Sequence, residues 1–357
     1  FKEAASAAEL ARGIASSDVT GTMAAWSAVN VLVDRCSAIR SDDPALQTLT
    51  REAQMITDRL LTIERREVTP IEAFPNADLT RILMQGEDLY VLDNRNEQVY
   101  RVTLTTEGGT TVPGTRQPIP AMRRSGVVNQ FTVGDLVDIA WAEDARGVSQ
   151  GNVITALDRS GILIDCPPRF LQNCSAQQLL GSDTWVEPVA MTFWQGRLYI
   201  LDPAANQIWR YEASGSSFPS RPTEYFVGQG RPDIRTAVDF AIDSAGSVYV
   251  LLRDGSLGRF TGGQRVNFGF ASFPEGQSMN DVDAFFLNSN PIAQGMAFVS
   301  RATRTVYETT LAGTFINSFR AYDESLFAQL SDVVVDSNRQ IIYTVSGNSI
   351  LSFSRSR

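Results

Sequence analysis

Histidine is absent from this sequence of 357 residues. Histidine is the side chain that most often acts as a general base near neutral pH, and it is also the commonest metal ligand. Its absence excludes a Ser-His-Asp or Cys-His nucleophilic system on this chain. Any catalysis would have to rely on other groups, such as carboxylates that hold a metal ion.

Cysteine is scarce, with three residues in the whole chain. Cys36, Cys166 and Cys174 lack the spacing of a zinc site. Cys166 and Cys174 flank a loop of seven residues, and they form either a disulfide that closes this loop or two unpaired, buried thiols. We favour the disulfide because other features of the sequence point outside the cytoplasm, where disulfides persist. Cys36 lies in a helical pattern and is expected to fill a core.

Basic residues are outnumbered, with 31 Lys+Arg against 40 Asp+Glu, and they form no dense stripe. We therefore expect no nucleic-acid partner. No stretch approaches the roughly 20 apolar residues that a membrane-spanning helix needs. The chain begins with Phe1 inside a helical pattern. We expect it to be part of something longer, with an export signal or membrane anchor upstream.

Residues 1–66 have the composition and periodicity of helices. Alanine, leucine, glutamate and arginine dominate, and apolar residues recur at helical spacing in three stretches. Asp43 followed by Pro44 has the pattern of an N-cap with proline in the first helical position. We predict three helices that form a short bundle or stalk, as a domain that ends at residue 66.

A repeated strand phrase dominates the remainder, residues 67–357. Leu89-Tyr90-Val91-Leu92-Asp93 returns as Leu198-Tyr199-Ile200-Leu201-Asp202, with weaker echoes elsewhere. When the units are aligned on this strand, its last residues are Asp93, Asp158, Asp202, Leu252, Ser300 and Ser346. Successive ends lie 44 to 50 residues apart, except for a first interval of 65.

That spacing is typical of four-stranded propeller blades. We predict a mainly β, six-bladed β-propeller, preceded by the helical segment. The long first interval contains an insertion at about 105–130, and the count rises to seven if it hides a further blade. The last unit lacks an outer strand, and residues 67–71 are expected to supply it and close the ring.

The phrases at 89–93 and 248–250 resemble NHL-type repeats. The combination of alanine-rich helices with the segments 134–141 and 201–211 is similar to C-terminal regions of Chloroflexi membrane proteins of the type 2C protein phosphatase-like class. In those proteins the phosphatase domain precedes a membrane helix, and helices plus a propeller follow it. The resemblance implies an extracytoplasmic, membrane-tethered module. It does not carry over phosphatase activity, because the catalytic domain with its metal-binding aspartates is absent from this chain.

Aspartates recur at one register of the predicted innermost strands. Four units place Asp138, Asp239, Asp283 and Asp332 there, whereas the other two have Arg81 and Ala190. First strands line the channel of a propeller, so these residues would form a ring. One interpretation is a site for a cation, Ca²⁺ above all, or for a cationic ligand. The other is that each aspartate binds backbone N–H groups of neighbouring blades, and we favour this structural role. Trp141, Trp185 and Trp194 lie near inner strands, and we expect them to pack in the core rather than to line a pocket.

Three functions are compatible with these patterns. We favour a non-catalytic extracytoplasmic binding, scaffold or sensor module that contacts a protein partner, in a membrane complex for example, and needs no cofactor. The alternative is a calcium-dependent hydrolase that resembles propeller lactonases and uses the aspartate ring. A glycan-cleaving pair of carboxylates is the third, but no pair can be assigned the required separation from the sequence.

Overall fold

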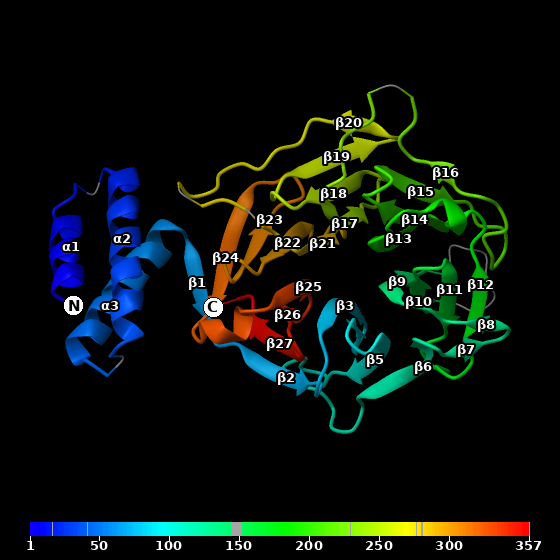
Figure 1. Cartoon of the computed structure of the whole chain (residues 1–357), viewed down its shortest axis with the longest axis horizontal. Helices are drawn as coiled ribbons and strands as arrows, with labels where there is room; N and C mark the ends of the chain where they lie inside the picture. The colour runs from blue at the N-terminus through cyan, green and yellow to red at the C-terminus, as the bar shows by residue number, and fades with distance from the viewer. Residues whose placement is uncertain are drawn as a thin grey trace.

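The computed structural model describes residues 1–356, except for positions 16, 41, 144–151, 229, 276 and 280. Six small sheets surround a common centre, and three α-helices lie together outside this ring (Figure 1). The prediction of a mainly β, six-bladed propeller preceded by a helical segment is therefore confirmed.

The helices are α1 Lys2–Arg12, α2 Val19–Ser37 and α3 Pro44–Leu60. Asp43 caps α3 by accepting a hydrogen bond of 2.8 Å from the Ala45 N–H, and Asp18 caps α2 in the same way. Small alanines of α1 pack against Trp26 of α2, which is 2% exposed. The alanines allow this close packing because they bring little side-chain volume to the helix contacts.

Each blade has four strands that follow one another from the centre outwards. The first two blades are β3 Leu79–Gln85, β4 Asp88–Asp93, β5 Gln98–Thr103, β6 Gln117–Arg123, then β9 Leu136–Ala142, β10 Val153–Asp158, β11 Ile162–Cys166, β12 Ser175–Gln178. The next two are β13 Ala190–Trp194, β14 Arg197–Asp202, β15 Gln207–Tyr211, β16 Thr223–Glu224, then β17 Ala237–Ile242, β18 Val248–Leu252, β19 Leu257–Thr261, β20 Gln264–Val266. The fifth blade contains β21 Ala284–Asn288, β22 Gly295–Ser300, β23 Thr305–Thr309 and β24 Phe315–Ala321. The sixth contains β25 Leu330–Asp336, β26 Ile341–Ser346 and β27 Ser349–Ser354, and its outer strand comes from the N-terminal side of the propeller.

All six second strands end at the residues on which the repeat was aligned, from Asp93 in β4 to Ser346 in β26. The insertion at 105–130 adds no blade in the described part of the chain. It contributes β6 and β7 Val127–Val128, and β7 pairs with β8 Phe131–Thr132 in a small hairpin.

The segment that leaves α3 adds a strand to two blades in turn. β1 Ile63–Arg66 runs parallel to β24, with Ile63 opposite Ser318. β2 Thr69–Ala73 then pairs antiparallel with β27 and is the outer strand of the sixth blade. Residues 63–66, which the sequence pattern groups with the helices, thus form a strand because the edge of β24 offers unpaired backbone groups. The division into two domains at residue 66 stays a prediction.

Arg65 in β1 joins the helical segment to the propeller. Its Nε lies 2.6 Å from Asp58 Oδ2 of α3, and its Nη1 lies 2.9 Å from Glu324 Oε1, which follows β24. The same Nη1 donates to the Ala321 carbonyl at 3.2 Å. The Arg65 side chain is only 10% exposed, so this network is well shielded from solvent.

Replacing Arg65 with methionine should destabilise the protein by about 2 kcal/mol, because it removes the cation that pairs with the partly buried Asp58 and one of the two that Glu324 contacts. The measurement is the free energy of unfolding in urea. The matched control is Arg12→Met, because Arg12 is 39% exposed in its ion pair with Glu52 and should contribute less than about 0.5 kcal/mol. Equal losses in the two variants would contradict the proposed role of Arg65.

Candidate functional site

Six residues, one from each blade, occupy the same position in the ring of first strands. Each lies opposite the penultimate residue of its own second strand. In blade order they are Arg81, Asp138, Ala190, Asp239, Ala284 and Asp332. Their strands surround the centre of the molecule in Figure 1, so these residues form the central ring.

A β-bulge accompanies each charged member of the central ring. The register shifts by one residue just before Arg81, Asp138, Asp239 and Asp332, whereas β13 and β21 begin at their alanines, and the residue before each alanine donates its N–H to the carbonyl of the residue opposite that alanine. A bulge inserts one extra residue and re-aims the side chain that follows it. The bulges therefore set the direction of the four charged side chains.

Asp283 does not belong to the central ring, so its predicted place there is wrong. Ala284 takes the equivalent position, opposite Val299. Asp283 lies one residue earlier, and its Oδ2 accepts a hydrogen bond of 2.9 Å from the Arg301 N–H. A shift of one residue turns a strand side chain to the opposite face, which separates Asp283 from the three other aspartates.

The three ring aspartates link neighbouring blades at every second interface of the propeller. In each, Oδ1 accepts from the N–H of the following residue at 2.8 to 2.9 Å. In each, Oδ2 accepts from a backbone N–H of the next blade: Asp138 from Met191 at 2.7 Å, Asp239 from Phe285 at 3.1 Å, and Asp332 from Ile82 at 2.8 Å. The interfaces joined are therefore those between blades two and three, four and five, and six and one.

Arg81 provides the positive charge within the ring. Its Nε lies 3.2 Å from Asp138 Oδ1, and its Nη1 lies 3.3 Å from Asp239 Oδ2. Burial lowers the pKa of Arg81. The surrounding carboxylates together raise this pKa by more than burial lowers it, so the net shift is upward. The guanidinium therefore stays charged and neutralises part of the aspartate repulsion.

Burial raises the pKa of two ring carboxyls. Burial is the largest cause, and Asp239 adds to it by repulsion, whereas Arg81 opposes it. The pKa of Asp138 is raised to about 6 and that of Asp332 to about 7. Asp332 thus titrates close to neutral pH.

This arrangement does not fit the calcium site that the sequence suggested. Calcium needs six to eight oxygen ligands, but the ring carboxylates already accept backbone N–H groups, and Arg81 lies where a cation would balance them. Nor does any group of three or more Asp, Glu, Cys or His side chains within the described residues have a metal-binding arrangement. The geometry instead matches the structural alternative, in which each aspartate binds neighbouring backbone.

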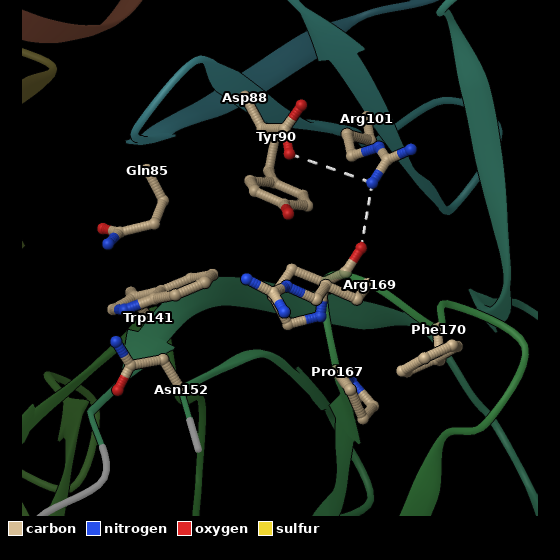
Figure 2. A pocket seen from close by; sticks show the side chains of 10 residues that line it. Gln85, Asp88, Tyr90, Arg101, Trp141, Asn152, Pro167, Arg169 and Phe170 are labelled. Carbon is tan, nitrogen blue, oxygen red and sulfur yellow. Dashed lines mark hydrogen bonds and ion pairs between the residues drawn. The ribbon is translucent and has the colours of Figure 1, made fainter. Parts of the chain in front are cut away.

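The structure joins Cys166 and Cys174 in a disulfide that closes the loop 167–173. This loop borders a cavity of about 740 Å³ between the first and second blades (Figure 2). Tyr90 of β4 and Trp141 of β9 lie side by side at the cavity, with ring centroids 6.2 Å apart, and Arg169 and Phe170 of the loop lie nearby. Trp141 packs against the core cluster, as expected, and also lines this pocket. Apart from its aromatic residues, this cavity could not be predicted from the sequence, because the lining residues come from two blades and lie far apart in sequence.

Replacing Asp332 with asparagine should lower the free energy of unfolding by about 2 kcal/mol at pH 8, because the new amide N–H₂ would face a backbone N–H donor. The pH dependence should change as well. Since the pKa values of Asp138 and Asp332 are raised, the folded state binds more protons than the unfolded state between about pH 4 and pH 7. Stability of the unmodified protein should therefore fall as pH rises through this window, and D332N should flatten the fall. Urea unfolding at pH 5 and pH 8 measures both effects.

Asp283→Asn is the matched control. Asp283 accepts a single backbone N–H, which an asparagine oxygen accepts equally well, so this variant should change stability by no more than about 0.5 kcal/mol and keep the pH slope. A slope that D332N leaves unchanged would show that Asp332 does not titrate in this window.

Comparison with other sequences reveals no matching protein-family model and no matching curated protein. Solved structures do match. Virginiamycin B lyase from Staphylococcus aureus is 11% identical over 81% of this chain and 99% of its own, with a TM-score of 0.50. A putative gluconolactonase is 10% identical over 83% of this chain and 95% of its own, with the same TM-score. At such low identity these likenesses show the fold alone: this chain is a six-bladed β-propeller similar to those of lyase and lactonase propellers.

Proposed function

We propose that this chain is a non-catalytic binding and scaffold module, located outside the cytoplasm in a membrane-anchored protein, and that it holds a protein partner on one face of the propeller. The observation that carries the proposal is the use of the central ring. Its three carboxylates bind backbone N–H groups, and its arginine pairs with two of these carboxylates. We therefore assign the ring a structural role rather than a reactive one.

Rigidity supports a scaffold role. The strands β1 and β2 and the Arg65 network tie the helical segment to the fifth and sixth blades. A partner that contacts both parts would meet a preformed surface, and preformed surfaces lose less entropy on binding.

The location rests on two features. A disulfide between Cys166 and Cys174 persists in oxidising compartments, which are mostly outside the cytoplasm. The resemblance to regions that follow a membrane helix in type 2C phosphatase-like proteins supports an anchor upstream. Among the described helices, none is long and apolar enough to cross a membrane.

Exposed apolar residues mark the face that we assign to the partner. Val127 is 69% exposed, Leu180 50% and Val186 64%. All three lie in the links that join the outer strand of one blade to the first strand of the next, on either side of the second blade. Because strands alternate in direction, such links share one face of a propeller. Exposed apolar side chains gathered on one face favour a protein contact.

Purification of the native full-length protein with its bound partner tests the proposal. The sequence has a single lysine, Lys2, so cross-linking should use carboxylate chemistry rather than amine chemistry. We expect a complex that buries at least about 1,000 Å². The double variant L180D/V186D should abolish it, because charges would be buried against apolar partner surface.

The matched control is Ile292→Asp. Ile292 is 95% exposed, but it lies between β21 and β22, on the opposite face, and its replacement should leave the complex intact. A protein that stays monomeric and carries no partner would overturn the proposal. A melting temperature that falls by several degrees on chelation of calcium would favour the calcium-dependent hydrolase instead, whereas we expect a change below about 1 °C.

The redox state of the cysteines tests the location. In protein quenched with acid directly from cells, unfolded and treated with a polymer-linked maleimide, only Cys36 should react before reduction, and all three cysteines should react after it. The variant C166S/C174S should show one addition under both conditions. Immediate labelling of Cys166 and Cys174 would contradict an extracytoplasmic location.

A further inference from the structure

The cavity between the first two blades contains two buried hydrogen-bond donors without an acceptor. Among the described residues, Trp141 Nε1 makes no hydrogen bond, and the Tyr90 hydroxyl has no acceptor for its proton, although the Arg101 guanidinium lies beside it; both atoms are shielded from solvent. Tyr90 is 0% exposed as a whole. A buried polar group left unpaired costs roughly 1–3 kcal/mol, so two of them in one cavity wall require an explanation.

The repeat itself shows that Tyr90 differs from two of its equivalents. Tyr199, Tyr249 and Tyr343 occupy the same place in their own blades, three residues before the end of the second strand, and two of them bond to an acceptor in the protein. The Tyr249 hydroxyl donates to Asp243 Oδ2 at 3.3 Å, and the Tyr343 hydroxyl donates to the Gly108 carbonyl at 2.8 Å. The first blade provides no such acceptor for Tyr90, so its hydroxyl is available to a ligand.

Aromatic surface forms the walls of the cavity. The rings of Tyr90 and Trp141 have centroids 6.2 Å apart and planes tilted by 40°. Phe170, which is 55% exposed, and the two prolines 167 and 168 extend the apolar surface toward the rim. Such walls suit a ligand with a flat, weakly polar face.

Two arginines differ in their freedom. Arg101 is held in place, because its Nη1 donates to the Pro168 carbonyl at 2.9 Å and lies 3.8 Å from Asp88 Oδ2 (Figure 2). Arg169 is exposed and makes no ion pair or hydrogen bond within the described part of the chain. Its guanidinium can therefore turn toward a ligand without breaking a bond, and a carboxylate is the anion that it would hold in a bidentate pair.

We propose that this cavity binds an oligosaccharide that contains uronic acid. The sugar ring packs on Tyr90 and Trp141, ring hydroxyls pair with Tyr90 Oη and Trp141 Nε1, and the carboxylate pairs with Arg169. A purely apolar ligand would leave the two buried polar atoms unpaired, and a simple anion would make no use of the aromatic walls. A cavity of about 740 Å³ has the size of a small-ligand site.

Ligand entry requires side chains of the wall to shift, because both polar atoms are covered in the free protein. Arg169 is the lining residue whose movement costs least. This site does not depend on the scaffold function, because the cavity is lined by the ends of β3 and β9 and the loop after β11, at the face opposite to the links that carry Leu180 and Val186.

Calorimetric titration of the intact chain with digalacturonic acid tests the proposal, with neutral galactobiose and glutarate as comparison ligands. We expect digalacturonic acid to bind with a dissociation constant below about 1 mM and the two others at least about tenfold more weakly. Binding should weaken as salt is added, because it includes an exposed charge pair. The variant R169Q should lose about tenfold in affinity, which corresponds to one charge-assisted hydrogen bond.

Tyr90→Phe and its matched control Tyr343→Phe separate a ligand role from a structural one. Y90F should bind about fivefold more weakly yet melt no lower than the unmodified protein, because the hydroxyl that it removes has no acceptor for its proton. Y343F should melt lower yet bind normally, because it loses the bond to Gly108. Absence of heat at about 10 mM digalacturonic acid, or equal binding of galactobiose, would overturn the proposal. So would a Y90F variant that melts lower and binds unchanged, since a buried water would then account for the hydroxyl.

Discussion

The propeller depends on hydrogen bonds that the ring aspartates accept from backbone N–H groups of the next blade, because these bonds constrain how neighbouring blades are positioned. Blades pack through apolar faces, and apolar contact has little directional preference. A carboxylate that accepts one N–H from its own blade and one from the next fixes the relative position of the two. Three such aspartates therefore fix the relative position of the blades at three of the six interfaces. Their burial is tolerated because Arg81 and backbone N–H groups solvate the charge in place of water.

The interface between the sixth and first blades shows how this constraint closes the ring. Asp332 accepts from the Ile82 N–H, and Ser331 Oγ donates to the Leu79 carbonyl at 2.6 Å. The outer strand β2, from the N-terminal side, completes the sixth blade beside β27. Inner side chains and an outer strand thus join the two ends of the propeller at opposite edges of the same sheet. Because the ring residues are committed to this closure, binding functions are left to the faces and to the cavity between blades.

The sequence predicted the blades well and the ring less well, for one physical reason. The second strands are buried along nearly their whole length and share one apolar phrase, so the spacing of that phrase located all six of their ends. The first strands are irregular next to the ring residue, with a register shift inside the strand in four blades, and a bulge changes which residue points inward without a clear signal in composition. The prediction that Asp283 is equivalent to Asp239 is therefore wrong by one residue, because Ala284 takes that position. The role of Arg81 in pairing with Asp138 was equally hidden, because it depends on two first strands from different blades.

The first blade departs from the repeat at two places, and both departures concern buried polar groups. Its ring position holds Arg81, where the other blades have aspartate or alanine, and that arginine makes a ring of three carboxylates tolerable. Its second strand holds Tyr90, whose equivalents Tyr249 and Tyr343 bond to protein acceptors. The acceptor of Tyr343 is Gly108, which lies in the insertion of the first blade itself, so that insertion completes the sixth blade while its own tyrosine stays without an acceptor. In a repeat protein, packing explains what the units share. A ligand site is therefore best sought where one unit lacks a partner that other units have, and in this molecule that unit is the first blade.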